Sequence, residues 1–297
     1  MALAPIPSDN RLTFAKLASI LLNSAALYVA AYMLMQFVVQ ATQATLAYRY
    51  SIPTIWYPSR LNFRIQDPEW RRAAIVVVFS AGQIVALIPT IFFLFRLPAA
   101  QEERGLLKVF YMWMVLHGLN QFFGAMVVDN FLSTGFWLAP RYLFLSSEVP
   151  AVTLGFLFAN LCLLFGYKLA LPFLHTCDSI SLMRLDNRTA LVWTTIFGPW
   201  FVGTLLINLC KFGTISGLEL AHLVSILILL IPMAVGVRFE MHEQTVQNPL
   251  RPRLNKTLLL LTLLSLGLFR FVFEKGIFFK PHGYLNYPGY DTVIQPK

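Results

Sequence analysis

The sequence predicts an all-α polytopic membrane protein, a transmembrane helix bundle of about seven spans. Of its 297 residues, 57% are hydrophobic and only 12% are charged, and the mean hydropathy is +0.65. A soluble domain carries about 25% charged residues, and a soluble chain of this length has no interior that would hide so much apolar surface. The same composition excludes a disordered chain and a small disulfide scaffold.

Seven apolar runs are long enough to cross the membrane, because a helix needs about 20 residues to span the hydrocarbon core. They lie within one domain that covers residues 1–297, and a tail of residues 274–297 follows the last run. The predicted spans are residues 17–39, 73–95, 107–128, 149–167, 190–210, 220–237 and 257–273.

Individual spans carry distinguishing features. The first follows two basic residues, as a signal peptide does, but its apolar stretch is too long for one, so we expect it to be retained. The second contains no charged residue, and Gly198-Pro199 predicts a kink in the fifth. Arg270 interrupts the seventh near one end, where its guanidinium can reach the interface.

The loop of residues 48–72 is expected to be an interfacial element after the first span. It combines five arginines, three prolines and several aromatic rings, and its residues 60–65 alternate polar and apolar side chains. Such alternation is typical of a short strand, so a small hairpin at the headgroups is one interpretation. The alternative is an aromatic belt with extended arginines. The connection of residues 129–148 is also aromatic and is expected to dip into the membrane.

The net charge of +9 fits a membrane surface better than a nucleic acid, because the basic residues lie in the short connections between spans. The lipid bilayer is therefore the expected partner, with other membrane proteins as further candidates and nucleic acid excluded. Orientation stays undecided, since the Lys and Arg residues divide 12 against 11 between the two sides. The three cysteines form no Cys-x-x-Cys pair, so no thiolate metal site is expected.

Polar side chains inside the third span form the first candidate site. His117, Asn120 and Gln121 are spaced to share one helix face near the middle of the membrane. Ionisable residues at this depth are expensive and are often functional. The group is therefore a candidate proton relay, metal site or substrate contact. The alternative is a buried neutral histidine that bonds a neighbouring helix.

A second candidate lies where the third span ends and the sixth begins. Glu219 and His222 are three residues apart on one helix face, and Asp129 should reach the same side of the membrane. One interpretation is a cluster of the three side chains at that membrane face, although a di-iron site would need further carboxylates. The alternative is a set of interfacial residues in contact with headgroups.

The order of features in residues 17–131 resembles the core of the site-2 proteases, which are intramembrane zinc peptidases. That family has a helix with His-Glu-x-x-His, a β-rich loop, a helix with a Gly-Pro element, and a helix ending in Leu-Asp-Gly. The matching elements here are Gln36-Phe37-Val38-Val39-Gln40, the loop of residues 48–72, Ser80-Ala81-Gly82-Gln83, Leu119-Asn120 and Asp129-Asn130. The chain is also similar to bacterial multi-pass proteins of this layout, which implies the cytoplasmic (inner) membrane.

The departures from that family predict the absence of its chemistry. Zinc hydrolysis needs two imidazoles to hold the metal and a carboxylate to activate water. Gln36 and Gln40 replace the histidines, Phe37 replaces the base, and only Asp129 matches a ligand. We therefore expect no metal, no cofactor and no catalytic residue, and the sequence favours a non-catalytic binding or scaffold component. The alternatives are a transporter with a polar site around His117 and a divergent intramembrane enzyme.

Overall fold

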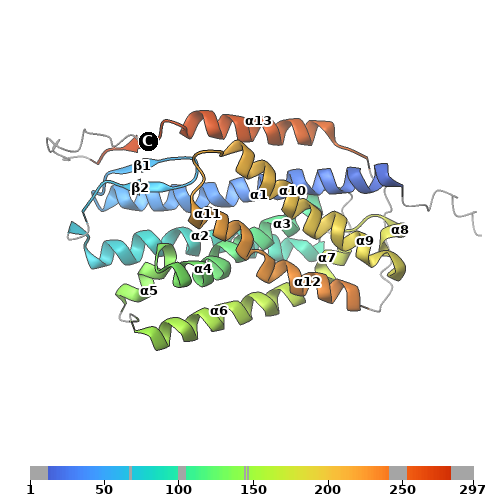
Figure 1. The fold of residues 1–297 in the computed structure, drawn as a ribbon, viewed down its shortest axis with the longest axis horizontal. Coiled ribbons are helices and arrows are strands. Elements are labelled where there is room, and N and C mark those ends of the chain that lie inside the picture. The colour runs from blue at the N-terminus through green and yellow to red at the C-terminus, as the bar shows by residue number, and fades with distance from the viewer. Residues whose placement is uncertain are drawn as a thin grey trace, which may run out of the picture.

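A computed structural model describes residues 13–66, 69–99, 105–143, 145, 147–240 and 253–281. The long helices lie side by side along the longest axis of the molecule (Figure 1). Six helices of the described residues are long and apolar enough to cross a membrane, or seven if one bent pair counts as a single span. The expected all-α polytopic bundle is confirmed, and the chain is an integral membrane protein.

The elements follow one another from α1 at the N-terminus to β3 after the last helix. Among the described residues the α-helices are α1 (Phe14–Arg49), α2 (Arg72–Ala99), α3 (Leu107–Leu119), α4 (Ala125–Leu132), α5 (Leu138–Tyr142), α6 (Glu148–Lys168), α7 (Ala170–His175), α8 (Ile180–Met183), α9 (Arg188–Val192), α10 (Gly198–Cys210), α11 (Gly217–Ser225), α12 (Leu227–Phe239) and α13 (Lys256–Phe273). The strands are β1 (Thr54–Trp56), β2 (Leu61–Phe63) and β3 (Ile277–Phe279). Short π and 3-10 turns are η2 (Asn120–Gly124), η3 (Gly135–Trp137), η4 (Leu185–Asn187) and η5 (Trp193–Phe197).

Helix α1 is the central element and is longer than the predicted span of residues 17–39. Its N-terminus is capped by Thr13, and its last three turns continue through polar residues that the hydropathy of the sequence did not include. These turns stay helical because Gln40 and Ala44 on their inner face are buried against the rest of the protein. Helices α2, α3, α10 and α13 all pack on α1.

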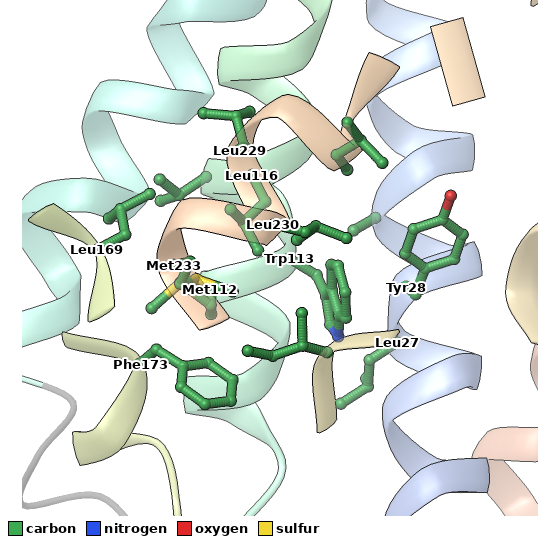
Figure 2. Packing of buried hydrophobic residues seen from close by; sticks show 14 of the residues in the cluster. Leu27, Tyr28, Met112, Trp113, Leu116, Leu169, Phe173, Leu229, Leu230 and Met233 are labelled. Carbon is green, nitrogen blue, oxygen red and sulfur yellow. The ribbon is translucent and has the colours of Figure 1, made fainter. Parts of the chain in front are cut away.

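The core of the bundle is aromatic as well as aliphatic. Tyr28 of α1 and Trp113 of α3 meet edge to face with ring centroids 5.0 Å apart, and Figure 2 shows both rings among the leucines and methionines of α3 and α12. The outward faces of the bundle are also apolar. Their exposed phenylalanines include Phe92, Phe95, Phe156, Phe201 and Phe271. A surface of this kind is stable only against lipid, so these faces contact the bilayer.

The loop after α1 forms a hairpin, and a third strand from the far end of the chain completes a small sheet. β1 is central and pairs antiparallel with β2 on one side and β3 on the other. Trp56 of β1 is buried against Phe273, with ring centroids 4.7 Å apart. Gly276 permits the turn into β3, since it has φ +77° and a Cβ there would lie 2.5 Å from Ile55. The tail expected at residues 274–297 thus begins with a strand, and its residues 282–297 lie outside the described residues.

Several spans are interrupted rather than regular, among them the fifth and the third. The kink expected at Gly198-Pro199 is a π turn, η5, in which the N–H of Gly198 bonds the carbonyl of Trp193. Proline has no N–H for the carbonyl of Thr195, which instead accepts a 3.4 Å hydrogen bond from Ser24 of α1. The third span, residues 107–132, is followed by η3 and α5 at an angle of 80°, so the connection expected to dip into the membrane folds back as a short helix.

The number of spans predicts that the two ends of the chain lie on opposite sides of the membrane. If the third segment and its bent partner form one span, seven crossings separate residue 13 from residue 281. Reporter fusions placed before α1 and after β3 should therefore show opposite accessibility in intact cells or vesicles. Fusions that report the same side would contradict this topology and would mean that one of the seven segments does not cross.

Candidate functional site

A polar cavity of about 370 Å³ lies at the end of the bundle that carries the sheet. We call it the sheet-side cavity. Helices α1, α2, α4 and α11, the turn η2 and the hairpin of β1 and β2 all contribute to its wall. Its most frequent lining residue is glutamine, at Gln36, Gln40, Gln43, Gln83 and Gln121.

The glutamines reach the cavity because of helix periodicity. Gln36, Gln40 and Gln43 are spaced by four and three residues, so they occupy one face of α1. Each amide makes one hydrogen bond within the protein. The Gln121 amide nitrogen donates to Gln36 (3.1 Å), that of Gln43 donates to Gln83 (3.4 Å), and the Trp56 indole donates to Gln40 (2.8 Å). These hydrogen bonds hold the side chains of the wall in place, and each amide keeps further donors or acceptors that face the cavity.

Asp129 and His222 meet in this cavity, as the sequence predicted from the sides on which their spans end. The His222 Nε2 atom lies 2.7 Å from Asp129 Oδ1. The other carboxylate oxygen accepts a 2.6 Å hydrogen bond from the backbone N–H of Phe136. The turn that brings the Phe136 N–H to this oxygen requires Gly135, which has φ +54°. A Cβ at this position would lie 2.4 Å from Asp129 Oδ2. The buried carboxylate is thus fully bonded.

Glu219 lines the same cavity but has a different partner from the one expected. Its Oε1 atom accepts hydrogen bonds from both the Tyr32 hydroxyl and Lys211 Nζ, while Oε2 is buried without a partner. Ser216 caps the helix start and accepts from the Glu219 N–H at 3.1 Å. Burial lowers the pKa of Lys211, and the adjacent Glu219 carboxylate opposes this lowering. Sequence analysis missed Lys211, although its place directly after the fifth span was a signal for it.

The third-span group of His117, Asn120 and Gln121 is not brought together. Asn120 donates to the His222 carbonyl (2.8 Å) and accepts from Ser225 (3.0 Å), and Gln121 faces the cavity. His117 lies instead among aromatic rings, with no hydrogen bond to either residue among the described contacts. The π turn η2 begins at Asn120, directly after the helix that carries His117.

A second cavity of about 160 Å³ lies towards the N-terminal end of α1. Ser24 and Trp113 form part of its wall, and the Trp113 indole donates a 3.0 Å hydrogen bond to Ser24. Asp178 also lines this cavity and forms an ion pair with Lys108, with the charged atoms 2.5 Å apart. No motif in the sequence pointed to this cavity, because its residues come from six separate segments of the chain.

No family model, curated protein or solved structure matches this chain. Within the described residues, no group of three or more His, Cys, Asp or Glu side chains is placed to hold a metal ion. The side chains that line the sheet-side cavity supply amides, hydroxyls, carboxylates, an imidazole and the Arg60 guanidinium.

Removal of the Asp129 carboxylate should destabilise the protein. The Asp129→Ala variant leaves His222 and the N–H of Phe136 without their acceptor, and each lost buried hydrogen bond costs about 1–3 kcal/mol. We expect a clear decrease in the midpoint of thermal unfolding in detergent, measured by intrinsic fluorescence. Asp186→Ala, at an exposed position, is the matched control and should change little. Equal midpoints for the two variants would contradict the role assigned to Asp129.

The thiol of Cys177, which lines the second cavity, should react slowly with maleimides. Burial raises its pKa to about 11, and the thiolate is the reactive form. In a variant with Cys162→Ala and Cys210→Ala, we expect labelling at pH 7.5 to be roughly a hundredfold slower than for an ordinary thiol, with a rate that rises about tenfold per pH unit. The same variant in denaturant provides the reference rate. Equal rates in the folded and unfolded protein would contradict this assignment.

Proposed function

We propose that this integral membrane protein is a non-catalytic binding component that holds a peptide segment of another membrane protein in the sheet-side cavity. The observation that carries the proposal is the convergence of five glutamines from α1, α2 and η2 on one cavity within a membrane domain. On the resemblance described above, the membrane concerned is the bacterial cytoplasmic membrane.

Amide side chains suit a peptide ligand because they match its backbone. A glutamine offers two donors and a carbonyl acceptor, and a peptide group offers one donor and one acceptor. A peptide that entered the membrane domain without partners would lose the hydrogen bonds it made to water, at about 1–3 kcal/mol for each unpaired group. The apolar part of the wall, which includes Leu61, Phe63 and Phe79, accepts the side chains of such a segment.

The geometry also supports a relation to the site-2 protease layout without its hydrolysis. Gln36, Gln40 and Asp129, which match that family's zinc-binding positions, line one cavity. The residue that replaces the general base, Phe37, is half exposed and stacks near Trp56 with ring centroids 5.4 Å apart. Two amides and one carboxylate are a poor ligand set for zinc. We therefore propose that a peptide binds at this position and is not cleaved, because the zinc ligands and the general base of that family are replaced here.

Site-specific photo-crosslinking in cell membranes tests this proposal. A benzoyl-phenylalanine at Leu61, in the cavity wall, should give a discrete adduct with a second polypeptide. The same probe at Phe271, on the lipid-facing surface of α13, is the matched control and should give none. Substitution of Gln43→Leu together with Gln83→Leu should abolish the adduct at residue 61, because it removes donors and acceptors from two sides of the cavity.

Two results would overturn the proposal. One is a residue-61 adduct that survives the double substitution in a protein that still purifies as a single folded species. The other is the absence of any polypeptide adduct at residue 61, with crosslinks to lipid alone, which would assign the cavity to lipid headgroups instead.

A further inference from the structure

The second cavity differs from the sheet-side cavity in the chemistry of its wall. Most of the side chains that line it are apolar, and Figure 2 shows four of them, Met112, Trp113, Phe173 and Met233. The others include Ile20, Leu106, Val109 and Leu116. A wall of this composition binds an apolar group by removing its surface from water.

The polar side chains of this wall have partners within the protein. The Asn23 amide bonds two backbone groups just before α13, at 2.7 and 2.9 Å. The Ser24 hydroxyl bonds a carbonyl of η5 at 3.4 Å and the Trp113 indole at 3.0 Å. Asp178 accepts from a backbone N–H at 3.0 Å and pairs with Lys108. A buried water needs about two to four polar partners, so this wall favours an apolar occupant over water.

The cavity follows one face of α3. Leu106, Val109, Trp113 and Leu116 all line it and are spaced by three or four residues. At a rise of 1.5 Å per residue, Leu106 and Leu116 are about 15 Å apart along the helix axis. A volume of about 160 Å³ that extends over this length is narrow. The shape therefore suits a single hydrocarbon chain better than a bulky ring system.

The wall also carries a cation without a partner. Arg253 lines the cavity, and its guanidinium forms no hydrogen bond or ion pair within the described part of the chain. The charge of Asp178, which lines the cavity too, is already compensated by Lys108. One positive charge of the wall is therefore left for an anionic group of a ligand.

A buried arginine adds positive charge on this side of the bundle. Arg188 lies one turn before Leu191, a lining residue of α9, and is 2% exposed. Its three guanidinium nitrogens are buried without a hydrogen-bond partner among the described residues. Its electrostatic neighbours are Cys177, which lines the cavity, and Glu240, which offsets part of its charge. Arg188 contributes to the potential at the cavity, and we assign it no contact with a ligand.

We propose that the second cavity binds a single-chain anionic amphiphile, a carboxylate with a hydrocarbon tail. The tail lies along the α3 face, in contact with Trp113 and Met233, and the carboxylate accepts hydrogen bonds from Arg253. Guanidinium and carboxylate match in charge and in geometry, since two parallel N–H groups meet two oxygens. A phospholipid carries two tails, and this narrow space holds one. Binding here goes beyond the peptide proposed for the sheet-side cavity and does not depend on it.

Quenching of Trp113 fluorescence tests the site. The full-length chain is reconstituted in phosphatidylcholine nanodiscs and titrated with 11-bromoundecanoate, whose bromine quenches an indole that it contacts. We expect saturable quenching in the wild-type protein, and Trp113→Phe should lose the saturable part while keeping an aromatic ring. The methyl ester of the same acid has the tail without the charge. It should need at least a tenfold higher concentration for half-saturation.

Two variants separate the contribution of the charge from that of the tail. Arg253→Gln should raise the half-saturating concentration about tenfold, because a neutral amide does not replace a charge-assisted bidentate pair. Val109→Phe, which reduces the space along α3, should also raise it about tenfold, because the tail loses room. Arg184→Gln, at an exposed position after α8, is the matched control and should leave it unchanged.

Three outcomes would overturn this assignment. One is equal quenching in the wild-type protein and Trp113→Phe, which would report only partition into the bilayer. Another is wild-type half-saturation for a folded Arg253→Gln variant or for the methyl ester. The third is saturable quenching by phosphatidylglycerol with brominated tails but none by 11-bromoundecanoate, which would assign the space to a membrane phospholipid. If Val109→Phe does not yield folded protein, Arg253→Gln decides. No partner polypeptide is present, so a failure here is distinct from a failure of crosslinking.

Discussion

The structure depends on the pairing of polar groups along the inner face of α1, where lipid surrounds the bundle and water is scarce. Within the hydrocarbon region, each polar atom needs a partner from the protein itself. Asn23 illustrates this, because its amide bonds the Arg253 carbonyl at 2.7 Å and the Asn255 N–H at 2.9 Å, and so attaches the start of α13 to α1. Similar bonds at Tyr28, Tyr32 and Gln36 attach α10, α11 and η2.

The same requirement explains the small sheet at one end. α1 ends in polar turns whose side chains need a cover, and the hairpin after α1 supplies it through the Trp56 bond to Gln40. β3 then joins this hairpin from more than 200 residues further along the chain. Arg270, which interrupts the last span, is accommodated nearby by Thr214 at 2.6 Å and Glu274 at 3.2 Å. The sheet end is therefore the part of the bundle where distant segments are joined.

Two pairs of ionisable side chains contribute to the wall of the sheet-side cavity. Lys211 with Glu219, and His222 with Asp129, bring four ionisable groups into the protein as two close pairs. Removal of one member of such a pair is destabilising, because it leaves its partner buried without compensation. Glutamine amides are the most frequent polar groups in the rest of the wall, and they offer hydrogen-bond donors and acceptors. The Oε2 atom of Glu219 is the exception, because it is buried without a hydrogen-bond partner.

The sequence by itself determined the helical membrane bundle, because hydropathy over about 20 residues is a local property. Span order also put Asp129 and His222 on one side of the membrane, and the tertiary structure brings them within 2.7 Å of each other. Only the tertiary structure decided that Lys211 and Tyr32 bond Glu219 and that Asn120 bonds His222 and Ser225. These depend on helix rotation and on pairings between distant segments. The sequence alone does not fix these contacts, because a helix that is apolar on several sides can bury any of them.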